Sequence, residues 1–181
     1  MDFTHDQIED VFSGKNNKTL RETITHRRYK ALAQVCEASY EQHLDSPLGE
    51  VLRQLKSSGG PFYKQFLNPY GDLAYSTFSI ADPSALAARG VYTYYVGDVL
   101  KYVGRCKDSM KKRVNQGYGK IHPKNCFRDG QATNCHLNAL ITAATSDVTL
   151  WLCRMDSDGE IEAVESQFIQ RYLPPWNIQR R

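Results

Sequence analysis

Two short runs rich in tyrosine and β-branched residues, separated by Gly97 and Asp98, constrain the fold more than any other part of the chain. Aromatic and β-branched side chains favour strands, and a Gly-Asp pair between two such runs favours the tight turn of a β-hairpin. The runs contain a cluster of four tyrosines, Tyr92, Tyr94, Tyr95 and Tyr102. Two well-packed strands also produce such a cluster, so the hairpin by itself indicates no chemistry.

A basic segment follows the hairpin. Between Lys101 and Arg128 the chain carries nine Lys and Arg residues and a single acidic residue, Asp108. Asp108 is a suitable cap for a helix that carries Lys111, Lys112 and Arg113 and ends at Gly117. Such a concentration of cations indicates a polyanionic partner such as nucleic acid, although a solvated basic surface gives the same pattern.

Five elements in a fixed order carry a specific resemblance. They are Gly90-Val91-Tyr92, then Tyr102-Val103-Gly104, an Arg on the next helix, a Glu on a later helix and a closing Pro174-Pro175-Trp176-Asn177. In this order they resemble the GIY-YIG nuclease superfamily over residues 90–177, about half the chain. The resemblance implies an α+β fold in which helices flank a small antiparallel sheet of about three strands, with an N-terminal helical extension.

The register of the hairpin decides whether Tyr92 and Tyr102 converge, as the resemblance requires. With a two-residue turn, Tyr92 lies opposite Val103, which places Tyr92 and Tyr102 on opposite faces of the sheet. A loop of odd length, such as residues 96–98, or a β-bulge restores a shared face. We therefore expect one of these two irregularities.

The resemblance also assigns catalytic residues. It implies that Tyr92 and Tyr102 position or deprotonate the attacking water and that Arg113 grips phosphate oxygens with two donors. Arg113 stands one residue further from Gly104 than the common family spacing, so Arg105 or Lys112 is an alternative. A phenol is a poor base unless nearby cations lower its pKa, and Lys101, Arg105 and Arg113 are expected to do so.

Three further positions depend on the resemblance. Asn177 matches the closing Asn of the family, which orients the Glu-bearing helix or a catalytic water. The family has His or Tyr four residues after the Arg, where this chain has Gly117. That role is left to Tyr118, His122 or His136.

Glu165 is the expected metal ligand. On its helix it follows Ile161 by four residues and precedes Phe168 by three, beside the apolar stripe, where a carboxylate needs a cation or a hydrogen-bond partner. A structural ion pair, for example with Arg171, is the alternative. As the single matched ligand, Glu165 implies one hard cation, Mg²⁺ or alternatively Mn²⁺, with water and phosphate completing its shell. A zinc site at Cys126, Cys135 and His136 lacks a fourth ligand at a usual spacing.

The expected partner is double-stranded DNA. The side chains expected to contact it lie in the basic segment and are Lys101, Arg105, Lys107, Lys111, Lys112, Tyr118, Lys120 and Lys124.

Length and composition limit the organisation of the chain. The 181 residues allow a nuclease core over residues 89–181 with a helical extension, residues 1–88, packed on it. Residues 1–58 are expected to be helical, with one long helix over residues 19–41 and another starting at Ser46-Pro47. The five cysteines form no CxxC pair and no long apolar run occurs, which favours a reduced, cytoplasmic protein that does not span a membrane.

The expected function is a metal-dependent DNA endonuclease that hydrolyses phosphodiester bonds, with the layout of a type II restriction enzyme, prokaryotic or phage-encoded. Two alternatives are a nucleic-acid-binding module without catalysis and a repair or mobile-element nuclease. Restriction targets are usually palindromic, so a homodimer would match their symmetry. The apolar stripes of the N-terminal helices are either part of a core or the surface that dimerises or clamps the duplex.

Overall fold

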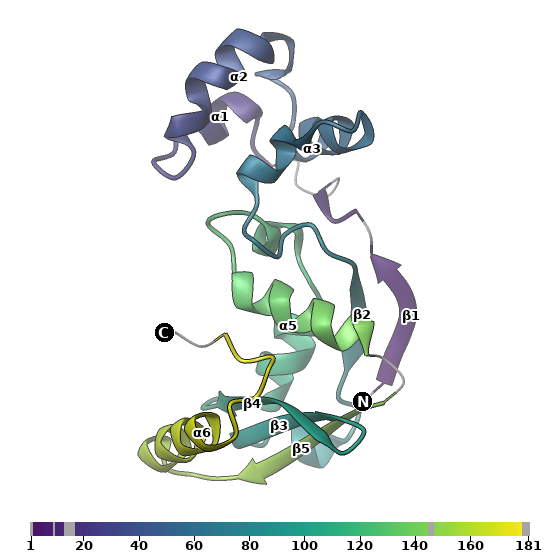
Figure 1. The fold of residues 1–181 in the computed structure, drawn as a ribbon, viewed down its shortest axis with the longest axis vertical. Coiled ribbons are helices and arrows are strands. Elements are labelled where there is room, and N and C mark those ends of the chain that lie inside the picture. Colours follow the sequence, from purple (N-terminus) through teal and green to yellow (C-terminus); the bar gives the residue numbers. More distant parts are fainter. Residues whose placement is uncertain (1, 9, 13–16, 145–146, 179–181) are drawn as a thin grey trace. The chain divides into compact units, whose positions relative to one another are not determined.

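The computed structural model describes residues 2–8, 10–12, 17–144 and 147–178 (Figure 1). The chain packs as two compact units, here called the sheet unit and the helical unit. The sheet unit contains the described residues of 1–7, 75–121 and 136–181, and the helical unit those of 8–74 and 122–135. The division expected from the sequence lies at residues 88 and 89. In the structure, residues 75–88 belong to the sheet unit and residues 122–135 to the helical unit.

Three antiparallel strands form the centre of the sheet unit, in the order β4-β3-β5. Their bounds are β3, Gly90–Val96; β4, Val99–Cys106; and β5, Val148–Arg154. Gly97, whose φ is 53°, and Asp98 form the turn between β3 and β4. Glycine adopts this left-handed backbone conformation without the steric cost that a Cβ brings.

A β-bulge sets the register of the hairpin. Next to the turn the strands pair as in a two-residue hairpin, but further along Tyr94 pairs with Tyr102, so Lys101 is an extra residue in β4. Tyr92, two residues before Tyr94, therefore shares a face with Tyr102. The expected irregularity is confirmed in its bulge form, and the loop of odd length is not the solution.

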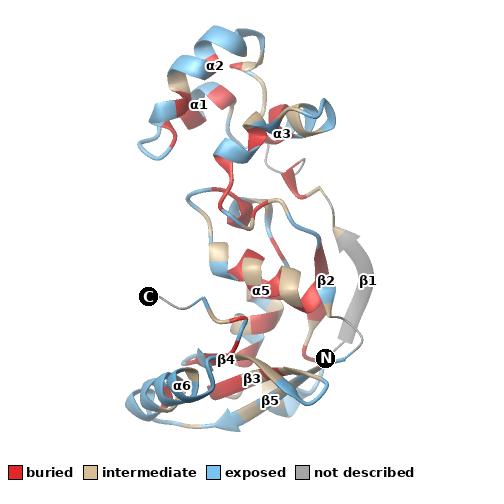
Figure 2. Cartoon of the chain, in the orientation of Figure 1, coloured by how far each residue is buried: buried red, intermediate tan, exposed pale blue. Residues whose placement is uncertain are grey.

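The two faces of this sheet pack against different elements. The face that carries Tyr92 and Tyr94 packs against the π-helix η5 (Lys111–Tyr118) and against α5 (Ala132–Ala143). The opposite face, which includes Val91 and Val103, packs against Ile161 of α6 (Asp158–Tyr172). Figure 2 shows α6 with a largely exposed outer surface and the central strand β3 with several buried residues.

Helix α6 has clear ends. Ser157 caps it, its side chain accepting from the backbone N–H of Glu160, and Leu173 ends it in the left-handed conformation with φ 45°. Pro174 follows directly, as expected for the residue that stops this helix.

The start of η5 differs from the sequence expectation. The Asp108 carboxylate does not cap the helix, because Lys112 Nζ lies 2.6 Å from it. Ser109 Oγ instead accepts from the backbone N–H of Lys112 at 3.3 Å. Gly117 has a non-helical backbone, with φ −102° and ψ −115°, and kinks the chain within η5, so regular helix stops there as expected although Tyr118 follows within the same element.

One buried amide joins three elements of the sheet unit. Asn138 of α5 donates through Nδ2 to the carbonyls of Ser76, at 2.9 Å, and of Tyr118, at 2.7 Å. Its Oδ1 accepts from the backbone N–H of Ser76 at 3.2 Å. Asn138 thereby holds β2 (Tyr75–Ser79) and the end of η5 against α5. The short helix α4 (Pro83–Leu86) follows β2.

The expectation of a wholly helical segment from residue 1 to 58 is wrong at its start. Residues Asp2–Ile8 form strand β1, which pairs with β2 in a two-stranded sheet. An unpaired strand edge offers backbone hydrogen bonds to any extended segment that reaches it, and this long-range pairing outweighs local helical preference.

The helical unit is made of short helices. They are α1, Leu20–Ile24; η2, Lys30–Leu32; α2, Ala33–Ser39; η3, Glu41–His43; α3, Leu48–Ser57; η4, Pro61–Phe66; and η6, Pro123–Cys126. The single helix expected over residues 19–41 is wrong, because α1 stops at Thr25. The Thr25 hydroxyl donates to the carbonyl of Glu22 at 2.8 Å, a local bond that competes with helix continuation.

The apolar stripes of this unit belong to its own core. Leu20, Ile24, Leu48 and Val51 are almost fully buried. These positions therefore offer no free surface for a partner.

The chain has an α+β fold in which helices flank a small antiparallel sheet, as expected. Within the described ranges, no helix is both long enough and apolar enough to cross a membrane.

Candidate active site

A cluster of tyrosine rings occupies the face of the hairpin that packs against η5. Tyr92, Tyr94 and Tyr118 are fully buried, and the ring centroids of Tyr92 and Tyr102 lie 5.9 Å apart. The hydroxyls of Tyr94 and Tyr118 lie 2.8 Å apart and share a hydrogen bond. Sequence reasoning missed Tyr94, although its position two residues after Tyr92 places it on the same face.

Gly104 makes room for this cluster. It lies directly opposite Tyr92 in the hairpin. A Cβ at this position would lie 2.5 Å from Cε1 of Tyr102 and 2.8 Å from the hydroxyl oxygen of Tyr92, closer than real side chains approach. The glycine is therefore a steric requirement of the two tyrosines.

Arg113 of η5 reaches the cluster. Its Nε donates to the hydroxyl of Tyr92 at 3.0 Å, and its guanidinium lies 5.6 Å from the ring centroid of Tyr118. Burial by itself would lower the pKa of Arg113, but Tyr92 and Tyr102 more than offset this, so the pKa is raised and the side chain stays cationic. Neither alternative, Arg105 or Lys112, makes this contact; both are paired with carboxylates.

The π-helical backbone explains how Tyr118 comes to lie beside Arg113. In an α-helix, the residue four positions on returns to the same side, whereas the wider π-helix needs five. The backbone N–H of Gly119 donates to the carbonyl of Val114, five residues back, at 2.8 Å. Gly117, whose backbone is non-helical, kinks the chain at this point, and the Tyr118 ring lies beside the guanidinium of Arg113.

The pKa values of the tyrosines are higher than the sequence suggests. Burial raises the pKa of Tyr92, and the charge of Arg113 opposes this only in part. Burial likewise raises the pKa of Tyr102, well above that of an ordinary phenol. The expectation that nearby cations lower these pKa values is wrong, because desolvation of the phenolate outweighs the attraction to Arg113.

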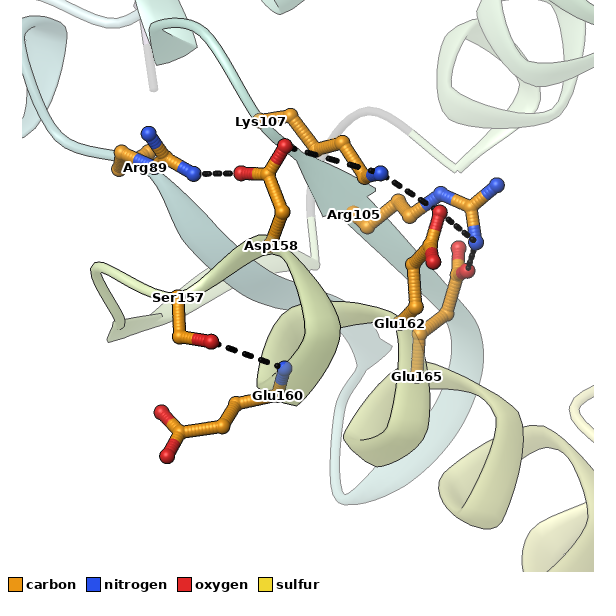
Figure 3. A network of polar contacts seen from close by, with 8 residues as sticks. All are labelled: Arg89, Arg105, Lys107, Ser157, Asp158, Glu160, Glu162 and Glu165. Atoms are coloured by element: carbon orange, nitrogen blue, oxygen red, sulfur yellow. Dashed lines mark hydrogen bonds and ion pairs between the residues drawn. The ribbon is translucent and has the colours of Figure 1, made fainter.

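Glu165 lies on α6 beside the edge strand β4, with its side chain 16% exposed. Its Oε2 accepts from Nη1 of Arg105 at 2.8 Å (Figure 3). The ion pair given as the alternative to a metal therefore exists, with Arg105 in place of Arg171. Burial raises the pKa of Glu165, whereas the charges of Arg105 and Arg113 lower it. Helix α6 packs on the face of the sheet opposite the tyrosine cluster, so the interaction between Glu165 and Arg113 is one of charge and not a contact within that cluster.

Several cations expected to contact DNA are paired with acids of α6 or, for Lys112, with Asp108, which precedes η5. Lys107 Nζ lies 2.6 Å from Glu162 and 3.8 Å from Asp158, and Arg89 pairs with the same aspartate (Figure 3). Lys112 pairs with Asp108, as noted above. These pairs reduce the positive charge that the sequence count suggests.

The remaining expected contacts have different positions. Lys111 and Lys120 are exposed, and Lys101 is partly exposed in the bulge. Tyr118 is fully buried, so the expectation that its ring contacts DNA at the surface is wrong. Lys124 belongs to the helical unit.

Asn177 and the two histidines are not part of the tyrosine cluster. Asn177 accepts from the backbone N–H of Val103 at 2.9 Å and donates to its carbonyl at 2.7 Å, which fastens the C-terminal segment to β4. His136 contacts the carbonyl of Trp176 at 3.1 Å, and burial lowers its pKa. His122 lies in the helical unit, where Nδ1 accepts from the backbone N–H of Lys124.

Metal ligands are sparse. Across the described ranges, no three His, Cys, Asp or Glu side chains come together as a metal-binding group. Cys126 and Cys135 are buried with their sulfurs 3.9 Å apart, in the helical unit.

Comparison of the chain with protein-family models, curated proteins and solved structures finds no match.

Proposed function

We propose that this chain is a metal-dependent DNA endonuclease of the GIY-YIG type that hydrolyses phosphodiester bonds. The hydrogen bond from Arg113 Nε to the Tyr92 hydroxyl carries the proposal. It joins two residues that the motif assigns to the phosphate and to the attacking water, from elements that have no local reason to meet. Glu165, the third motif residue, interacts with the charge of the same arginine.

A divalent cation fits the residues at Glu165. The carboxylate is only slightly exposed, and its partner Arg105 also lies 3.9 Å from Glu162. A cation that binds Glu165 would displace Arg105 from its Oε2. Mg²⁺, or Mn²⁺, binds through one carboxylate when water and substrate phosphate supply the other ligands. When bound, the cation would neutralise charge on the phosphate and lower the pKa of a water molecule.

The other proposed roles in catalysis belong to Arg113, the tyrosines and Arg105. Arg113 has further guanidinium N–H groups beyond the Nε that Tyr92 uses, and these are available to phosphate oxygens as charge accumulates on them. Tyr92 is fully buried and accepts from Arg113, so it orients the guanidinium. Tyr102 is only partly buried, keeps its proton at neutral pH and positions the phosphate and the attacking water through a hydrogen bond. Arg105 keeps the Glu165 carboxylate ionised and oriented until the cation binds.

One observation favours a second candidate, a nucleic-acid-binding module without catalysis. Arg105 already occupies Oε2 of Glu165, as a purely structural ion pair would. A binding module should bind DNA equally well with a chelator and never cut it.

The deciding experiment is incubation of supercoiled plasmid with Mg²⁺ and three proteins: the wild type, Glu165→Ala and the control Glu162→Ala. Both substitutions remove one carboxylate from α6, but Glu162 pairs with Lys107. We expect cutting by the wild type and by Glu162→Ala, and none by Glu165→Ala, which should still bind DNA. Equal cutting by all three would refute the assignment of Glu165, and no cutting by the wild type would favour the binding module.

Within the nuclease class, the proposal extends to a cytoplasmic type II restriction enzyme that acts as a homodimer, with a repair or mobile-element nuclease as the alternative. One Glu165 and one cation cut one strand at a time, so cleavage of both strands at a palindrome is simplest with two subunits. Light scattering on the free protein and its DNA complex, with sequencing of the product ends, tests this. A monomer in both states that only nicks plasmid would favour the repair-type enzyme.

A further inference from the structure

A cavity of about 600 Å³ lies wholly within the helical unit, and the proposed active site does not use it. Its walls come from two segments, residues 17–48 and 122–131. Long-range bonds hold these segments together: the Tyr29 hydroxyl donates to Asp129 Oδ1 at 2.6 Å, and Arg28 Nη1 donates to the carbonyl of Arg128 at 2.9 Å. The cavity is therefore formed by tertiary structure and has a volume typical of ligand sites.

The polar groups around this cavity are mainly hydrogen-bond donors. Lys18 and Lys124 are the lysines among its lining residues, and both are exposed. The Nδ1 atoms of His26 and His122 accept from backbone N–H groups, at 3.4 Å and 3.2 Å. Each neutral imidazole therefore carries its proton on Nε2 and has that donor to offer. The side-chain oxygen of Gln131 accepts from Asn134, which leaves its amide N–H groups.

The cavity has few groups that would disfavour an anion. Among its described lining residues, Asp129 carries the sole carboxylate, and one of its oxygens accepts from Tyr29. Two ammonium groups against one carboxylate leave a net positive charge. Tyr29 and Phe127 are 2% and 0% exposed, so they present no free face on which a base could stack. The exposed rings of the lining are the imidazoles of His26 and His122.

We propose that this cavity binds a phosphodiester group of DNA through Lys18 and Lys124, with the imidazole N–H groups as additional donors. A donor-rich, positively charged lining matches the phosphate backbone of a nucleic acid. The volume exceeds that of a phosphate ion and admits a phosphate with its adjoining sugars. The inference rests on the proposed function for the identity of the ligand, DNA, and it adds a second contact surface in the helical unit.

Fluorescence anisotropy with a labelled DNA duplex in EDTA, at several salt concentrations, tests the site on the full chain. The variant Lys18→Ala/Lys124→Ala is compared with Lys30→Ala/Arg53→Ala, which removes two exposed cations of the same unit from outside the cavity. We expect the first variant to bind about tenfold more weakly and to lower the slope of log K against log salt by about two. The control should bind within about twofold of the wild type.

Equal losses of DNA affinity in both variants would overturn the site, because they would reflect net charge alone. Unchanged DNA affinity in the Lys18→Ala/Lys124→Ala variant would overturn it as well. A third arm titrates inorganic phosphate: phosphate binding that needs Lys18 and Lys124, with unchanged DNA affinity, would assign the cavity to a free anion and overturn the DNA proposal. Circular dichroism checks folding, and Lys18→Gln/Lys124→Gln replaces the alanine variant if that variant is unfolded. Binding is measured without metal, so the two proposals can fail separately. If the wild type never cuts plasmid but Lys18→Ala/Lys124→Ala still weakens DNA binding, the nuclease proposal alone is refuted.

Discussion

Arg113 donates through Nε to the hydroxyl of Tyr92 across 3.0 Å, which joins the π-helix η5 to the central strand β3 inside a cluster of buried tyrosines. A buried cation that is held by neutral hydroxyls retains its full charge. It is therefore positioned to stabilise a phosphate whose negative charge increases during reaction.

Substitution of Arg113 should distinguish the effect of its positive charge from the effect of its planar set of N–H donors. Arg113→Lys keeps a cation but loses the planar set of donors, and we expect the cleavage rate to fall about 10²-fold with little change in DNA affinity. Arg105→Ala should have a smaller effect, because Arg105 contacts Glu165 and not the tyrosines. Single-turnover cleavage at saturating DNA measures both. The reverse order of effects would assign the catalytic role to Arg105.

Gly104→Ala should abolish cleavage, because its Cβ would collide with both Tyr92 and Tyr102. The matched change Gly159→Ala, in the first turn of α6, meets no atom closer than 3.9 Å and should leave cleavage unchanged. It should keep or raise the free energy of unfolding by up to about 1 kcal/mol. Plasmid cleavage and urea unfolding check the pair. Normal activity of Gly104→Ala would show that the tyrosine cluster is not the site.

Deletion of Lys101 should leave the tyrosine cluster in place. Without Lys101 the bulge closes, but Leu100 still pairs with Tyr95 and Tyr102 with Tyr94, so Tyr102 stays on the same face as Tyr92. Lys101→Ala keeps the bulge, and we expect both variants to retain cleavage at saturating DNA. Circular dichroism and cleavage assays measure the two changes. Loss of cleavage in a folded deletion variant would contradict the register given to the hairpin.

Asn177→Ala should lower the stability of the folded protein rather than the rate of cleavage. It leaves the N–H and carbonyl of the buried Val103 without their side-chain partners, and we expect the free energy of unfolding to fall by about 2 kcal/mol. The cleavage rate per folded molecule should change little, because both amide atoms of Asn177 are engaged by the backbone. A large loss of rate in a variant of normal stability would restore a catalytic role for this residue.

The buried phenols predict a steep loss of stability at alkaline pH. Burial raises the pKa of Tyr92, Tyr94, Tyr102 and Tyr118 in the folded protein. The folded protein therefore retains protons that the unfolded chain releases above pH of about 10. The free energy of unfolding should fall above that pH by about 1.4 kcal/mol per pH unit for each such tyrosine.

Tyr94→Phe tests this effect, because it removes one titrating group and should make the alkaline slope shallower by one proton. Urea unfolding at several pH values, together with tyrosinate absorbance, measures the change. Gradual ionisation of the four tyrosines in a protein that stays folded would show that the cluster is open to solvent.

The elements that follow from local pattern could be predicted from the sequence. The tyrosine-rich runs around Gly97 and Asp98 predict the hairpin, the alternation after Val148 predicts the third strand, and Pro174 marks the end of the helix that carries Glu165. Local preference and turn chemistry suffice here, since each element is short and the neighbouring residues agree. Parity along the strands also showed that a bulge or an odd loop was needed, but only the folded hairpin decided between them.

Tertiary structure decided what depends on residues distant in the chain. The pairing of Glu165 with Arg105, 60 positions away, follows from the way α6 packs along β4, and no spacing rule encodes it. Strand β1 exists because β2 offers a free edge, and the π-helical turn that brings Tyr118 to Arg113 is stabilised by the packing of η5 against the sheet. The raised pKa values of the tyrosines have the same origin: desolvation is a property of the assembled core, and a sequence shows the phenols and the cations without showing how little water remains between them.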